Sequence, residues 1–305
     1  MFRNFLTRKR LDEGVKKYQA VNQNRFWKKW KDEMREGQYP GGENLLAACE
    51  RKRGRRTVLF ISEKIPTYDR DAGSRTLDFY IQEFIKRGYI VKFIPNDLMG
   101  KEPYTHRLEQ MGVEVFRGKR YQKTIINWIY TNYKLIDFVF LNYPCASMRY
   151  IDIFNRLGIP VMYYGVDLHY LRLQREYELT GNESIAEEAR KFYEKEAYLI
   201  EHADVVYYPS QIEVEIVKKE FYREDVKQLM INIYDMDYIS DAYDPGERDG
   251  IMFIGGYRHS PNADAVLWFS NKIFPRVYKE LKICFYIAGA DMSADISNIK
   301  AEGKD

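Results

Sequence analysis

Beyond residue 56 the chain alternates between short apolar runs and stretches in which apolar residues recur with helical spacing. The first run, residues 57–61, precedes a stretch whose Leu77, Ile81 and Phe84 fall on one helical face, and Gly88 stands where that helix would end. Parallel strands need crossover connections, which are usually helices, so this alternation predicts an α/β fold with a doubly wound parallel sheet. We expect strands at residues 57–61, 89–94, 113–116, 136–141, 160–164 and 204–208.

The alternation is interrupted at residues 243–250, where proline, glycine and charged residues indicate an interdomain linker. It then resumes, with a strand expected at residues 251–254, a helix at 263–279 and a strand at 283–287. A domain with only two strands is too small to cover both faces of its sheet or to bury a full core. We therefore expect an incomplete second domain and a chain truncated at its C-terminus. The sequence thus predicts two Rossmann-like doubly wound α/β domains, the second incomplete. The expected segments are an N-terminal extension (1–56), a first domain (57–245) and the start of a second domain (246–305).

The N-terminal extension is polar, helical in pattern and strongly basic. Trp27, Trp30 and Met34 are spaced at i, i+3 and i+7, which places them on one apolar face. Residues 1–56 hold 16 Lys and Arg against 7 Asp and Glu, a net +9, whereas the other residues hold 32 against 38, a net −6. A body that binds nucleic acid is therefore disfavoured. The basic run at residues 51–56 is either a solvated linker or a contact site for an anionic membrane face or partner.

Three further features limit the cellular setting and the chemistry. No run of about 18 apolar residues is present, so no membrane span is expected, and the first residues are too charged for a secretory signal. Cys49, Cys145 and Cys284 are far apart and odd in number, which fits neither a disulfide framework nor a metal cluster and indicates a reducing, cytoplasmic compartment. No histidine pair at i, i+3 or i+4 and no C-x-x-C motif occurs, so no metal site is expected.

Ligands of open α/β sheets bind beyond the carboxyl ends of the strands, and the first candidate stretch follows the first expected strand. Here Gly73 would let a ligand approach the backbone, Ser74 stands at a helix start that favours anions, and Arg75 adds positive charge. Asp71 belongs to the same stretch. The alternative is that Asp71 or Ser74 only caps the helix. The stretch is neither a dinucleotide fingerprint nor a Walker loop.

A second candidate stretch holds Asp167 and His169 at the end of the fifth expected strand. A histidine beside a carboxylate can bind hydroxyl groups or carry a proton. In the alternative interpretation, Asp167 caps the following helix and His169 lies on the surface. Further along, Ser210 and Glu213 have the spacing of a capping box, in which each side chain bonds the other residue's backbone N–H.

The third candidate stretch follows the first strand of the second domain. Gly255 and Gly256 form a turn before a helix that starts near Pro261, and such a turn could hold a phosphate. Its alternative is a plain strand-to-helix turn. The polar residues of this stretch are Arg258, His259 and Asn262.

Several of these stretches resemble motifs of glycosyltransferase family 4, of the type found in bacterial surface-polysaccharide gene clusters. They are "IPTYDRDAGSRTLDFY", "GYIVKFIPND", "IDFVFLNYP", "YYGVDLHYLRLQREYELTG", "ADVVYYPSQIE" and "FIGGYRHSPNADAVLWFSNKIFP", and they keep the family's order over about residues 57–290. The resemblance implies a GT-B architecture of two Rossmann-like domains and a retaining transfer that needs no bound metal. It also implies a nucleotide-sugar as donor substrate, no separate cofactor, and a glycan or lipid-linked acceptor.

The resemblance also assigns roles to the candidate residues. Asp167 and His169 match the segment beside the reacting sugar and are the expected catalytic residues. The expected substrate- and donor-binding residues are Asp71, Gly73, Ser74, Arg75, Ser210, Gly255, Gly256, Arg258, His259 and Asn262. Gly73 would lie in a flexible loop that faces the donor phosphates and the acceptor. A lipid-linked acceptor would also suit a cytoplasmic protein held at the inner face of the membrane.

The chain departs from the family pattern at the donor side. Gly256 stands where the family has an arginine, and Asn262 stands near the place of a lysine, so Arg258 or His259 is a candidate substitute. The family's paired glutamates would lie beyond Asp305. A non-catalytic saccharide- or nucleotide-binding remnant is therefore the alternative function. A different Rossmann enzyme, such as a methyltransferase or dehydrogenase, is a third, although a single Gly73 is a poor fingerprint for one.

Overall fold

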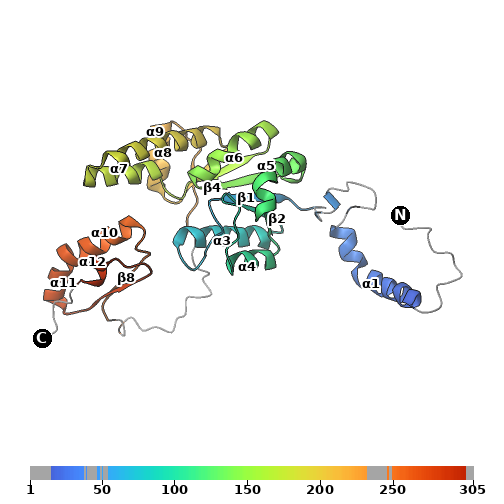
Figure 1. Ribbon diagram of the computed structural model, residues 1–305, viewed down its shortest axis with the longest axis horizontal. Helices are drawn as coiled ribbons and strands as arrows, with labels where there is room; N and C mark the ends of the chain where they lie inside the picture. The colour runs from blue at the N-terminus through green and yellow to red at the C-terminus, as the bar shows by residue number, and fades with distance from the viewer. Residues whose placement is uncertain are drawn as a thin grey trace. The chain divides into compact units, whose positions relative to one another are not determined.

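The computed structural model describes residues 15–37, 39, 47–48, 50, 54–231, 246 and 249–299. These residues divide into two compact units, one within 1–65 and 80–231 and the other within 66–79 and 232–305 (Figure 1). Cys49, the first half of the basic run at 51–56 and most of the expected linker at 243–250 lie outside the described residues.

The first unit is built on a seven-stranded, wholly parallel sheet with the strand order β3-β2-β1-β4-β5-β6-β7. The strands are β1 (Thr57–Ser62), β2 (Ile90–Pro95), β3 (Glu114–Val115), β4 (Phe138–Asn142), β5 (Val161–Tyr164), β6 (Val205–Tyr208) and β7 (Lys227–Gln228). The order reverses direction between β1 and β4, as it does in doubly wound sheets. The expected α/β fold with a parallel sheet is therefore confirmed.

The central strands are mostly apolar, with polar residues mainly at their ends, because helices cover both faces of the sheet. All of β1 is buried, and Leu59 pairs in register with Lys92 of β2 and Val139 of β4. Lys92 is an exception among these apolar residues, and its ammonium group pairs with Glu50 and Glu114.

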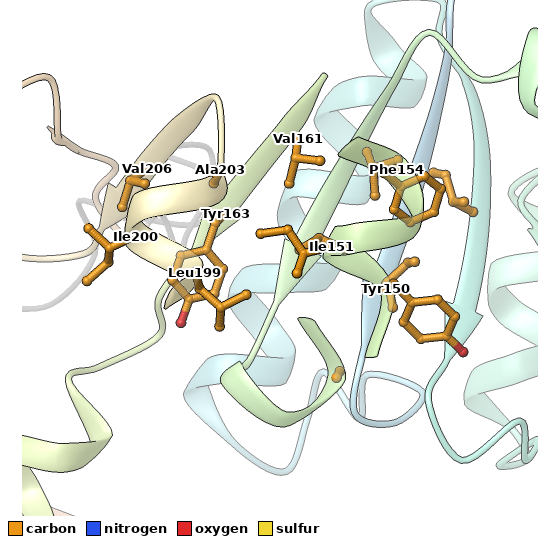
Figure 2. Close-up of a cluster of buried hydrophobic side chains, with 14 of the residues drawn as sticks. Tyr150, Ile151, Phe154, Val161, Tyr163, Leu199, Ile200, Ala203 and Val206 are labelled. Carbon is orange, nitrogen blue, oxygen red and sulfur yellow. The ribbon is translucent and has the colours of Figure 1, made fainter. Parts of the chain in front are cut away.

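Helices lie on both sides of this sheet (Figure 1). They are α3 (Ala72–Lys86), α4 (Tyr104–Gln110), α5 (Lys119–Asn132), α6 (Pro144–Leu157), α7 (His169–Thr180), α8 (Glu183–His202) and α9 (Gln211–Phe221), with a 3-10 turn at Tyr133–Leu135. All belong to the first unit except the N-terminal half of α3, residues 72–79, which is assigned to the second. On one face, Ile151 of α6 and Leu199 of α8 belong to the same core as Val161 and Tyr163 of β5 (Figure 2). On the other face, Phe84 of α3 packs edge-on against Phe60 of β1.

The second unit has a two-stranded parallel sheet in the part that the structure describes. Its strands are β8 (Ile251–Ile254) and β9 (Phe285–Ala288), and its helices are α10 (Ser260–Trp268), a π-helical turn (Phe269–Ile273), α11 (Phe274–Leu281) and α12 (Ala294–Ser297). A small core forms around Tyr257, Val266 and Ile296. Met252, Ile254 and Tyr286 of the two strands are exposed, so one face of this sheet carries apolar side chains at the surface.

The helix expected at residues 263–279 and the number of strands in the first sheet differ from the structure. The single helix expected at residues 263–279 begins earlier, at Ser260, and is interrupted by the π-helical turn before Pro275. Proline has no N–H to donate and clashes with the preceding turn, which accounts for the interruption. The sequence also gave no indication of β7, whose two residues are polar and exposed.

The N-terminal extension contains the expected helix, α1 (Val15–Gly37). Its aromatic residues are largely at the surface, since Trp27 is 49% exposed and Trp30 is 36% exposed. Among the described residues, no helix is long and apolar enough to cross a membrane.

Candidate functional site

The best-defined polar site lies at the carboxyl end of β5, where the chain turns sharply into α7. Gly165 begins this turn and donates its N–H to the carbonyl of Tyr207 on β6, at 3.0 Å. A Cβ on Gly165 would lie 2.3 Å from the ring of Tyr208, so no larger residue fits here without displacing a fully buried tyrosine. The absence of a side chain thus allows the turn to pack directly on β6.

His169 is the first residue of α7, and its ring is fixed from several sides. Its Nδ1 lies 2.8 Å from Asp167 Oδ1, and the other oxygen of Asp167 accepts a hydrogen bond from Arg172 Nε at 3.0 Å. The imidazole stacks on Phe192 of α8 with 5.2 Å between ring centroids and 12° between planes. Tyr143, which precedes α6, meets the same imidazole edge-on at 6.2 Å.

These contacts exclude the interpretation in which Asp167 caps the following helix and His169 lies on the surface. The cap residue of α7 is Leu168, which makes no side-chain cap bond, so Asp167 does not cap the helix. The side chain of His169 is only 12% exposed, so it is not a surface histidine. Asp167 and His169 are instead an ion pair at a strand end.

Glu196 is a member of this site that the sequence analysis missed. Its carboxylate is fully buried and accepts hydrogen bonds from the backbone N–H groups of His169, at 2.9 Å, and Tyr170, at 3.0 Å. Its Oε1 also lies 3.5 Å from His169 Nδ1. A sequence signal did exist, because Glu196 interrupts the apolar stripe that Phe192 and Leu199 form on α8.

The electrostatics of the site favour a charged histidine. Burial lowers the pKa of His169, but the hydrogen bonds to Asp167 and Glu196 outweigh burial and raise the pKa to about 9. For Asp167, burial acts to raise the pKa, and the contacts with His169 and Arg172 prevail and hold it below its usual value. At neutral pH the ring of His169 is therefore a charged imidazolium beside the ionised carboxylate of Asp167. The Nδ1 atom of His169 contacts Asp167, and within the described residues its Nε2 atom has no hydrogen-bond partner.

Ser210 joins the same site through Glu213. The expected capping box at the start of α9 is confirmed, with Ser210 Oγ accepting from the backbone N–H of Glu213 and the Glu213 carboxylate accepting from Ser210. The other oxygen of Glu213 accepts from the backbone N–H of Leu168 at 3.3 Å. Burial raises the pKa of Glu213 despite these hydrogen bonds. The hydroxyl of Ser210 is thus engaged in fixing the turn that carries Asp167 and His169.

The stretch after β1 forms a separate, local group. Asp71 accepts hydrogen bonds from both the backbone N–H and the hydroxyl of Ser74, each at 2.7 Å, and one from the hydroxyl of Thr67. Asp71 therefore caps α3. Gly73 was expected in a flexible loop and instead lies in the first turn of this helix, because the cap starts the helix at Ala72. Arg75 follows in the same turn and is exposed.

The turn after β8 is also held by local hydrogen bonds. The carbonyl of Gly256 accepts from the backbone N–H of His259 at 3.2 Å and from Asn262 Nδ2 at 3.1 Å. A Cβ on Gly255 would lie 2.9 Å from Asn262 Nδ2, so Gly255 leaves room for this contact. Arg258 forms an ion pair with Asp291 at 3.2 Å. As expected, Pro261 stands at the start of α10.

A second acidic residue that the sequence analysis missed is Glu63, directly after β1. One of its oxygens accepts the backbone N–H of Ala146 at 2.6 Å, at the start of α6, and the other accepts from Asn96 Nδ2 at 3.3 Å, after β2. Glu63 thus ties together the carboxyl ends of three neighbouring strands, β2, β1 and β4. In the parts of the chain that the structure describes, no group of three or more His, Cys, Asp or Glu side chains could hold a metal ion.

No protein-family model matches the sequence, and no curated protein matches it. Among solved structures, the chain is similar to MurG of Acinetobacter baumannii, with 10% identity over 80% of this chain and 61% of that one and a TM-score of 0.43. It is also similar to HepE of Anabaena in complex with UDP and glucose (14% identity, 79% and 70% covered, TM-score 0.43). A third is the sucrose-phosphate synthase of Thermosynechococcus elongatus (12% identity, 80% and 73% covered, TM-score 0.49). At this level of likeness, function has to be inferred from the side chains themselves.

Proposed function

We propose that this chain is a glycosyltransferase that moves a sugar from a nucleotide-sugar donor to a glycan, lipid or other acceptor. The observation that carries the proposal is the largely buried His169 imidazolium, which Asp167 and Glu196 hold at the carboxyl end of β5 in a doubly wound parallel sheet. Carboxyl ends of parallel strands are where such sheets bind nucleotides and sugars.

The chemistry of glycosyl transfer suits a fixed cation at this position. The bond between the sugar's anomeric carbon and the phosphate oxygen breaks, a bond to the acceptor oxygen forms, and the acceptor's proton leaves with the nucleoside diphosphate. Positive charge develops on the sugar and negative charge on the diphosphate, so prepositioned donors and cations stabilise the transition state. With Nδ1 held by Asp167, the Nε2–H of His169 is the group that donates to a sugar hydroxyl or a phosphate oxygen.

The finer parts of this proposal rest on the motif resemblance. They are retention of the anomeric configuration, no requirement for a bound metal or separate cofactor, and a role in polysaccharide biosynthesis. Gly73, Ser74 and Arg75 in the first turn of α3, and Gly255 and Gly256 after β8, are proposed to bind donor or acceptor. At α3 the support is the positive end of the helix dipole together with the charge of Arg75, while Asp71 already accepts the N–H of Ser74. After β8 the support is the start of α10 directly beyond the turn.

We also propose a cytoplasmic location with peripheral attachment to the inner face of the membrane. The support is the net charge of +9 in residues 1–56 and the exposed Trp27 and Trp30 of α1. Clustered Lys and Arg are attracted to anionic lipids, and tryptophan favours the membrane–water interface. Lipid-linked acceptors would make such attachment useful.

A saccharide- or nucleotide-binding protein without transfer activity is the second candidate. The turn after β8 argues against transfer by this chain, because Arg258 is already paired with Asp291 and Asn262 with the carbonyl of Gly256. Both side chains would have to exchange these partners for a donor phosphate. The two candidates differ in turnover and share the expectation of binding.

Calorimetry and product assays on the same full chain separate the candidates. The chain is titrated with UDP-, GDP-, ADP- and dTDP-sugars, and nucleoside diphosphate release is measured with each donor in the presence of lipid and glycan acceptors. A glycosyltransferase gives both heat and release with at least one donor. Heat without release would favour the binding protein, and the absence of both with every donor would refute the proposed function.

A further inference from the structure

We propose that Glu196 of α8 is a positioning residue for the reaction, which orients His169 by holding both its backbone and its ring. This inference rests on the function proposed above, because it assigns Glu196 a role through His169. No contact between Glu196 and substrate is implied.

The carboxylate of Glu196 spans the N-terminus of α7. Its two oxygens accept the backbone N–H groups of two successive residues, His169 at 2.9 Å and Tyr170 at 3.0 Å. These N–H groups belong to the first turn, where an α-helix has no internal acceptor for them, and the helix dipole favours a negative charge there. Since α7 starts at His169, the direction in which its first side chain leaves the backbone is set by this contact.

The same helix also fixes the imidazole ring. Phe192 stands one turn before Glu196 on α8, and the ring of His169 lies flat against it. Glu196 Oε1 lies 3.5 Å from His169 Nδ1, and Asp167 approaches the same nitrogen at 2.8 Å. α8 therefore supplies both a flat apolar surface and a carboxylate, and this combination leaves Nε2 as the nitrogen available to a ligand.

Capping alone would not require a carboxylate in the protein core. The side-chain caps of α8 and α9 are local: Asn182 caps α8, and Ser210 caps α9, each from the residue just before its helix. Glu196 instead reaches α7 from another helix and is 0% exposed. A buried carboxylate is costly unless charges and hydrogen bonds compensate it, and the charged ring of His169 provides such a compensation.

Several charged and titratable groups surround His169, and each can influence its protonation. Asp167 and Arg172 come from its own segment, Glu196 from α8, and Glu213 of α9 contacts the neighbouring Leu168. Lys195 of α8 stands 4.8 Å from the centroid of Phe192. Among these groups, only Asp167 and Glu196 lie within 4 Å of the His169 ring nitrogen in the described structure.

The test replaces Glu196 by glutamine, which keeps the shape and removes the charge. The pKa of His169 is measured by NMR titration in the full chain, where the four histidines are assigned with single His→Asn variants. We expect Glu196→Gln to lower the pKa of His169 by about one unit or more, since a carboxylate within hydrogen-bonding range favours the charged ring. The pH above which donor-dependent activity declines should fall with it, and kcat should fall more than KM rises.

Two further variants make the result specific. Asn182→Ala removes the cap of α8, which accepts the N–H of Ser184 at 3.1 Å, and should lower the melting temperature with no change in the His169 pKa. Glu196→Asp keeps the charge but shortens the side chain, so it should give a smaller drop in the His169 pKa. If Glu196→Gln does not fold, the pKa of His169 is measured in Glu196→Asp instead.

The outcomes are distinguishable. If the Glu196 variants melt earlier but leave the pKa of His169 and the pH profile unchanged, Glu196 is only a helix cap and the inference is wrong. If the pKa falls as expected while the unmodified chain shows no transfer with any donor, the positioning of His169 by Glu196 stands and the proposed glycosyltransferase function fails.

Discussion

Protonation of His169 should make the stability of the folded chain fall as pH rises through the alkaline range. Contacts with Asp167 and Glu196 prevail over burial and raise the pKa of His169 from its ordinary 6.5 to about 9. A group whose pKa is higher in the folded state stabilises that state fully below the unfolded pKa and ceases to do so above the folded pKa. The stabilisation that protonated His169 gives the folded chain is therefore lost between about pH 6.5 and pH 9.

The size of the effect follows from the shift. One pKa unit corresponds to about 1.4 kcal/mol, so His169 contributes about 3 kcal/mol that disappears across this window. Domains are stable by only about 5–15 kcal/mol, so the loss is measurable. At acid pH the sign is opposite: the pKa of Asp167 is held below its usual value, so its contribution is present at neutral pH and is lost on acidification.

Urea denaturation at about pH 6 and about pH 9.5 tests this prediction with a matched pair of variants. His169→Asn removes the titrating ring and should lose much less stability between the two pH values than the unmodified chain does. His106 is an exposed histidine on α4, and His106→Asn should retain the full pH dependence. Equal losses in all three proteins would show that His169 is not held as an imidazolium.

Two other features give predictions of different kinds. Gly165→Ala places a Cβ 2.3 Å from the buried ring of Tyr208 and should destabilise the chain by about 1–3 kcal/mol in a thermal melt. The control is Gly256→Ala, whose Cβ meets open space and which should change stability by less than about 0.5 kcal/mol. Replacing Arg51, Lys52, Arg53, Arg55 and Arg56 by glutamine should weaken cosedimentation with anionic vesicles. Undiminished vesicle binding by that variant would count against membrane contact through the basic run.

The fold was predictable where the chain has to bury both faces of a strand. The interior residues of β1 and β4 are apolar because helices lie above and below them, and both strands were expected near their observed positions. β7 was not predicted because its two exposed polar residues, Lys227 and Gln228, lack the apolar pattern of a buried strand. The break in the helix before Pro275 was missed because the apolar spacing continues across it.

The candidate site was predictable only in part, since strand ends can be located from sequence but the residues that meet them cannot. Asp167 and His169 were identified because they follow β5 directly, and the structure brings them together at 2.8 Å. Glu196 was missed because its contact with His169 depends on how α7 packs on α8. Asp71 was identified by position, and its carboxylate proves to be engaged in capping α3.

The central claim is that this chain transfers a sugar with the help of His169, and NMR of the donor's anomeric proton tests it most directly. With the donor found by calorimetry and a matching acceptor, the donor signal should give way to a product signal of the same anomeric configuration. The rate should fall by about tenfold or more in His169→Asn, as the loss of a charge-assisted hydrogen bond predicts, and remain unchanged in His106→Asn. Equal rates in the two variants, or an unaltered donor in the unmodified chain, would contradict the account.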